Sequence, residues 1–140
     1  MLLPIALLLA VSGPAPASGP PSVVTVEVSD AASDEGHVVA MLFADADGFP
    51  REPAKAFRTE RVAAVPGTLT ITLADVPPGD YALAVFHDAD DDGEVATNFI
   101  GIPQERVGAA NVSGIGRPSF AKSTVTVDEP AEHFTLTFIN

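Results

Sequence analysis

Hydrophobic and polar residues alternate along much of this chain with a period of two, the pattern of half-buried β-strands. The clearest alternation is in the threonine-rich segment 68–73, where Leu69, Ile71 and Leu73 face one way. Segments 37–44 and 81–87 are almost continuously apolar, which is typical of central strands. The expected strands begin with one from Val23 onward that carries Val24, Val26 and Val28, and continue with 37–44, 68–73, 81–87, 124–127 and 134–139, with weaker candidates at 58–65 and 95–102.

Glycine, proline, aspartate or asparagine bounds each of these segments, and that spacing predicts an all-β fold, an antiparallel β-sandwich of about seven or eight short strands. Helix content is expected to be minimal, because β-branched residues are dense and no window keeps a helical stripe for three turns. The exception is a single helical turn at 52–57, where Pro53 suits the first position. Segment 103–119 has several glycines and little apolar pattern, and we expect it to be a long loop.

The first residues differ from the rest of the chain. An apolar run at 2–11 precedes the small-residue stretch that ends in Ala15-Pro16-Ala17, which fits a secretory signal cleaved after Ala17. No lysine or arginine precedes the run, so an apolar first strand or a retained anchor helix is the alternative. We therefore expect a signal peptide at 1–17, a disordered tail at 18–22 and one domain at 23–140.

Charge and cysteine content limit the partners and the cellular location that the sequence allows. Seven Lys and Arg against 19 Asp and Glu give a net charge of −12, which disfavours nucleic acid and anionic membranes as partners. The chain has no cysteine, so it has neither disulfides nor a site for a bacterial lipid anchor. No later segment is long enough to span a bilayer. The expected product is a soluble, exported protein of the periplasm or the extracellular space.

The sharpest candidate site is the run Asp88-Ala89-Asp90-Asp91-Asp92-Gly93-Glu94, which follows the apolar segment 81–87 directly. Aspartates at the first, third and fifth places with glycine at the sixth resemble the start of a calcium-binding loop. The twelfth place holds Phe99 instead of an acidic residue, so the run is not an EF-hand and calcium binding should be weak. The expected ligands are Asp88, Asp90, Asp92, the Glu94 carbonyl and Asn98, with Asp91 or water completing the shell.

The simpler interpretation of the same run is a strand connection in which Asp92-Gly93 makes the turn and the other aspartates are solvated. The second acidic segment, Asp45-Ala46-Asp47-Gly48, has two carboxylates and is expected to be a plain turn.

Catalytic signals are weaker. The histidines are His37, His87 and His133, each near a predicted strand end, where a structural role is the common case. One alternative function is a small-molecule hydrolase that uses His87 as base with Asp88 or Asp90 as its orienting partner. No serine lies in a nucleophile elbow.

Several motifs resemble a known family. The turn Pro77-Pro78-Gly79-Asp80-Tyr81 is similar to turns of transthyretin-like and carboxypeptidase-regulatory-like sandwich domains. Together with Gly48-Phe49-Pro50, the segment 84–88, the segment 98–103 and Gly116-Arg117-Pro118-Ser119-Phe120, it makes the chain resemble the bacterial family DUF2141 from about Val23 to Asn140. That resemblance implies an exported small β-sandwich and no specific activity.

The chain departs from the family pattern at two places. Ala96 stands where relatives commonly carry a further aspartate, which removes one oxygen ligand from the acidic loop. Asn111 is single where relatives tend to have two asparagines.

The leading hypothesis is an exported, non-catalytic binding or accessory module with a weak calcium-stabilised loop at 88–94. Its functional end would be built by that loop and by segment 103–119, and its partner would be an envelope protein or a small ligand. The alternatives are the hydrolase and a purely structural, self-associating envelope protein.

Overall fold

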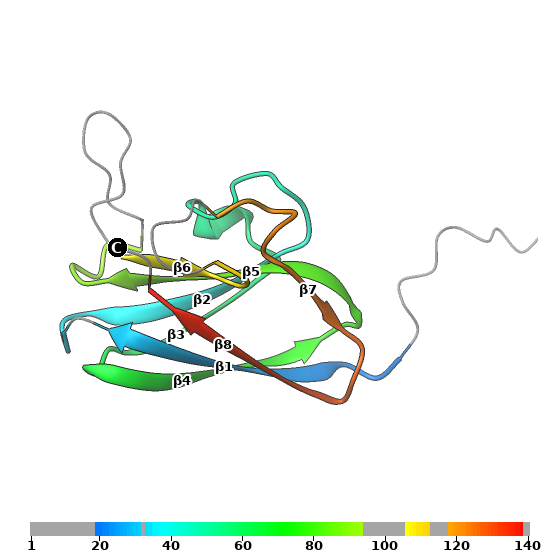
Figure 1. Ribbon diagram of the computed structural model, residues 1–140, viewed down its shortest axis with the longest axis horizontal. Helices are drawn as coiled ribbons and strands as arrows, with labels where there is room; N and C mark the ends of the chain where they lie inside the picture. Colours follow the sequence, from blue (N-terminus) through cyan, green and yellow to red (C-terminus); the bar gives the residue numbers. More distant parts are fainter. Residues whose placement is uncertain (1–18, 32, 94–105, 113–117, 139–140) are drawn as a thin grey trace, which may run out of the picture.

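The computed structural model describes residues 19–31, 33–93, 106–112 and 118–138, and it is nearly all β (Figure 1). One short 3₁₀ turn, η1 (Pro53–Lys55), accompanies the strands, with proline at its start as expected. The strands are β1 (Ser22–Ala31), β2 (His37–Phe43), β3 (Arg58–Ala63), β4 (Gly67–Val76), β5 (Gly79–Asp88), β6 (Val107–Ala109), β7 (Thr124–Val127) and β8 (Ala131–Thr137).

The strands form two sheets that face each other (Figure 1). The small sheet has the order β4-β1-β8, and the large sheet has the order β3-β2-β5-β6, with β7 also pairing with β5. This arrangement confirms the predicted all-β sandwich. Its pairing is not uniformly antiparallel, because β1 and β8 run parallel to each other.

The main core lies between the two sheets. In β1, Val24, Val26 and Val28 are fully buried, and the alternation seen in the sequence places their polar neighbours on the outer face. Leu69, Ile71 and Leu73 of β4 fill the same layer opposite the large sheet. The alternation of apolar and polar residues therefore indicates a sheet with one face in the core and the other in solvent.

The central strands of the large sheet, β2 and β5, are buried on both faces, which explains their continuous apolar sequences. A second apolar cluster covers the outer face of this sheet. Phe49 packs edge-on against Phe43 and against Phe120, with ring centroids 5.3 and 6.1 Å apart. The segments before β3 and before β7 thus supply the side chains that cover this face.

Some of the expected segments differ from the observed elements or are not described. The segment 103–119 is not entirely loop, since β6 lies within it and pairs with residues 84–86 of β5. The proposed signal, residue 18 of the proposed tail and the weak strand candidate at 95–102 lie outside the described residues. The last residue of the proposed tail, Ser22, is buried as the first residue of β1, so the ordered domain begins one residue earlier than expected. Within the described residues, the structure contains no helix of the length and hydrophobicity that a membrane span requires.

Candidate functional site

The acidic run begins at the last residue of β5. Asp88 pairs with His37 in the antiparallel register of β5 and β2, so the sheet fixes its position. The side chain of Asp88 is fully buried, with 0% exposure, which is unusual for a carboxylate. A central strand therefore delivers a buried acidic group to the end of the sandwich.

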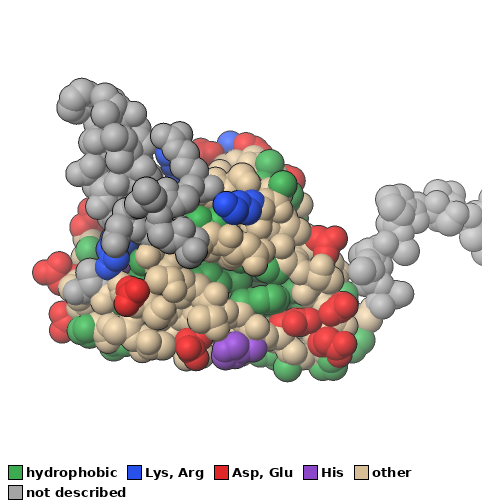
Figure 2. Space-filling view, in the orientation of Figure 1, with side chains coloured by type: hydrophobic (Ala, Val, Ile, Leu, Met, Phe, Trp, Pro, Cys, Tyr) green, Lys and Arg blue, Asp and Glu red, His purple; other side chains and the backbone are tan. Residues whose placement is uncertain are grey.

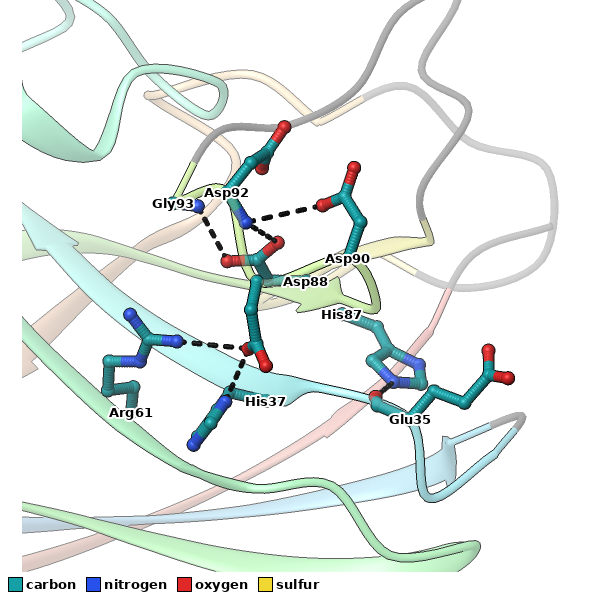
Figure 3. Close-up of polar contacts among 9 residues, drawn as sticks. Glu35, His37, Arg61, His87, Asp88, Asp90, Asp92 and Gly93 are labelled. Carbon is teal, nitrogen blue, oxygen red and sulfur yellow. Dashed lines mark hydrogen bonds and ion pairs between the residues drawn. The ribbon is translucent and has the colours of Figure 1, made fainter.

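The loop after β5 folds back onto this carboxylate (Figure 3). Asp88 accepts hydrogen bonds from the backbone N–H groups of Gly93, at 2.8 Å, and Asp92, at 3.2 Å. Gly93 adopts a positive φ of 77°, which glycine permits without strain. Burial raises the pKa of Asp88 above that of an ordinary aspartate, although the Gly93 and Asp92 N–H bonds oppose the shift.

Asp90 and Asp92 complete a group of three carboxylates with Asp88. One oxygen from each lies within 4.8 Å of the others, and both added side chains are exposed. Oxygen-only groups of this kind suit hard divalent cations such as calcium. The other expected ligands, Glu94 and Asn98, lie outside the described residues.

Asp91 points elsewhere and does not join this group. Its carboxylate pairs with Arg61 of β3, at 3.1 Å, and with Nδ1 of His37 in β2, at 2.5 Å. Asp91 also has a positive φ of 56°. The loop thus directs alternate side chains to opposite sides, and Asp91 attaches it to β2 and β3 of the large sheet.

Sequence reasoning did not anticipate the roles of Arg61 and His37. Neither residue is near the acidic run in the chain, and they reach Asp91 only because β3, β2 and β5 are adjacent in the large sheet. The alternation of the aspartates was a usable signal, because it separates Asp91 from Asp90 and Asp92.

Gly36, the residue just before β2, lies against the loop. It has a positive φ of 65°, and a Cβ at this position would overlap the carbonyl oxygen of Asp88 and approach Ala89 to 2.8 Å. The backbone of the acidic loop therefore lies directly against that of Gly36, and a side chain there would displace it.

His87 faces away from the three aspartates. It is 4% exposed, and its Nε2 lies 2.6 Å from the carbonyl oxygen of Glu35. A carbonyl only accepts, so Nε2 carries the proton and donates it. Figure 3 shows the His87 ring directed toward Glu35. His87 and Asp88 are successive residues of β5, so their side chains point to opposite faces of the sheet. The geometry does not pair His87 with Asp88 or Asp90.

The other candidates form local contacts. In the second acidic segment, Asp45 accepts the N–H of Asp47 at 2.9 Å, and Lys55 pairs with Asp47 at 3.0 Å, as in an ordinary turn. His133 lies on the outer face of the small sheet, 3.9 Å from Glu27. These contacts account for both features without a ligand.

Comparisons with known proteins give one match. The family model described as "Uncharacterized protein conserved in bacteria (DUF2141)" matches residues 26–135, which include every strand apart from the ends of β1 and β8. No curated protein and no solved structure matches the chain.

Proposed function

The chain belongs to the DUF2141 family of bacterial proteins, and on the geometry of its acidic loop we propose that it is an exported, non-catalytic binding module with a calcium-stabilised site. The observation that carries this proposal is the convergence of Asp88, Asp90 and Asp92, whose ligand oxygens lie within 4.8 Å of one another.

The donor set favours calcium over softer metals. Three carboxylates supply oxygen only, and calcium takes about six to eight oxygen ligands in flexible geometry. The Glu94 carbonyl, Asn98 and water would complete the shell. With the acidic residue of the twelfth position replaced by Phe99, we expect affinity in the weak range of extracellular calcium modules.

Electrostatics support a cation at this place. Asp88 is buried and accepts hydrogen bonds from two backbone N–H groups, while the carboxylates of Asp90 and Asp92 stand close by. Burying a carboxylate beside other carboxylates is unfavourable, and a divalent cation offsets both the desolvation and the repulsion.

The cation would have a structural role in this proposal. It would hold the loop 88–93 in one conformation at the end of the sandwich, and that end would bind an envelope protein or a small ligand. Loops on a rigid sheet scaffold are the usual place for binding residues.

Thermal unfolding tests the proposal. The purified protein is melted in chelator and then in millimolar calcium, beside the double variant Asp90→Ala/Asp92→Ala. A ligand that binds only the folded state stabilises it by about 2.7 kcal/mol at a hundredfold excess over Kd. We expect the wild type to melt several degrees higher in calcium and the variant to show no response.

The matched control is Asp45→Ala/Asp47→Ala, which removes two carboxylates from the other acidic segment. This control should keep the calcium response. Equal responses in all three proteins, or none in the wild type, would show that the acidic run is a solvated turn.

A further inference from the structure

The strand β8 is at the edge of the small sheet, and among the described residues no strand pairs with its outer side, although Gly108 of β6 lies against the carbonyl of Thr137 at its end. Its inner side pairs in parallel with β1 over all seven residues, with no register shift. Alternate residues of a strand direct their N–H and C=O groups to opposite sides, so part of this backbone faces outward. Such an edge is a template for another strand.

The edges of the large sheet carry features that discourage pairing. The strands β6 and β7 have three and four residues, and β3 carries the charged residues Arg58, Glu60 and Arg61. By contrast, β8 has no proline, lysine or arginine. The carboxylate of Glu132 accepts hydrogen bonds from the backbone N–H groups of Asp128 and Glu129. Its charge is therefore directed toward the preceding turn and not toward the open edge of β8.

The core is incompletely covered on the same side. Phe134 of β8 is aligned with the buried Val26, yet it is only partly buried, as is Val125 of β7. Figure 2 shows hydrophobic side chains at the surface between β8 and the strands of the large sheet. At the opposite edge, the core-facing residues of β4 are nearly inaccessible, since Leu69, the most exposed of the central three, is at 7%.

The two ends of β8 have opposite charge. The turn before it contains Asp128 and Glu129, both exposed. Beyond its other end, the guanidinium of Arg106 lies 5.9 Å from the ring centre of Phe138 and donates to the carbonyl of Asp30. Two antiparallel β8 strands would therefore place the acidic turn of each copy beside Arg106 of the other.

We propose that the protein forms a twofold dimer in which β8 pairs antiparallel with β8 of a second copy. With the axis at Phe134, the central residues of the two strands overlap, Phe134 faces its own copy, His133 faces Thr135, and no like charges are opposed. Three strands from each copy then make one continuous sheet of six. This dimer does not depend on the proposed calcium site.

Sedimentation velocity over a range of protein concentrations tests the dimer, with Thr135→Lys and Thr70→Lys as a matched pair. Both threonines are exposed and flank Glu27 from the two edges of the small sheet. We expect a wild-type dimer that Thr135→Lys weakens by about tenfold or more, and that Thr70→Lys leaves unchanged. A monomer at all concentrations, or equal effects of the two variants, would overturn the proposal.

A charge exchange gives a second test that does not touch the strand itself. Glu129→Arg should weaken the dimer, and adding Arg106→Glu should restore it, with circular dichroism confirming that each variant is folded. Failure of the second substitution to restore a folded variant would contradict the antiparallel arrangement.

Discussion

Gly36 is the residue on which the position of the acidic loop depends most directly. Its positive φ and its contact with the backbone at Asp88 leave no room for a Cβ. Gly67 has a similar φ, of 85°, but open space around it. Substituting Gly67 therefore measures the conformational cost alone, and substituting Gly36 measures that cost together with the cost of a steric clash.

We expect Gly36→Ala to lower the free energy of unfolding by more than about 3 kcal/mol, because strain and overlap with backbone atoms add. Gly67→Ala should cost about 1–2 kcal/mol, from the left-handed conformation alone. Chemical denaturation of both variants measures the difference. Equal losses would mean that the loop moves aside without cost.

The ionisation of Tyr81 can be followed by absorbance without interference, because Tyr81 is the only tyrosine and the chain has no tryptophan. Its hydroxyl donates to the carbonyl of Pro77 at 2.7 Å. Burial raises the pKa of the Tyr81 phenol above its usual value of 10.0, and the positive charge of Arg58 lowers it by a smaller amount. The neutral phenol is therefore favoured in the folded state.

The sign of the stability effect follows from this shift. The contribution of Tyr81 is fully present below pH 10.0 and is lost as the pH rises through the higher folded-state value. Ultraviolet absorbance of the phenolate should titrate at higher pH in the native protein than in denaturant. Arg58→Gln should raise the native midpoint further. Coinciding native and denatured curves would refute the shift.

At the scale of elements, Asp91 links the loop after β5 to β2 and β3. Its pairs with Arg61 and His37 are about half exposed, so their contribution to global stability is small. Their local effect is larger, since they hold one residue of a loop whose neighbouring N–H groups bond to Asp88.

We expect Asp91→Ala to lower the free energy of unfolding by less than about 1 kcal/mol and to speed hydrogen exchange at the Asp92 and Gly93 amides. Asp34→Ala, at an exposed position before β2, is the control and should leave both amides protected. Unchanged exchange in Asp91→Ala would show that the loop is held by Asp88 alone.

The strands most fully predicted from the sequence are those with a clear local pattern, either alternation or a continuous apolar run. Segment 124–127 matches β7, and segments 37–44, 68–73 and 81–87 identify β2, β4 and β5 to within a few residues. The short strand β6 could not be predicted, because Val107–Ala109 has too few residues to show a period. The parallel pairing of β1 and β8 joins the two ends of the domain, and no local pattern encodes it.

The candidate site divides in the same way. The spacing of Asp88, Asp90 and Asp92 predicted their convergence, since all three belong to one short loop. The burial of Asp88 and the partners of Asp91 could not be predicted, because they depend on which strands neighbour β5 in the sheet. The orientation of His87 follows from its place in β5, one residue before Asp88.

At the scale of the whole molecule, the net charge of −12 acts on stability independently of any single site. Carboxylates outnumber basic side chains on a small domain, and their mutual repulsion disfavours the compact state. Salt screens charges beyond about 10 Å at 0.1 M, so it weakens this repulsion without filling a specific site.

We therefore expect the melting temperature to rise with sodium chloride in the wild type and, to a similar extent, in Asp90→Ala/Asp92→Ala, because the repulsion is spread over 19 acidic residues. Calcium at the same ionic strength should add a further rise in the wild type alone. If sodium chloride produces the full calcium effect, the response belongs to the charge of the whole molecule and not to the loop. Comparing the two salts at matched ionic strength thus separates the global electrostatic effect from a local site formed by three carboxylates.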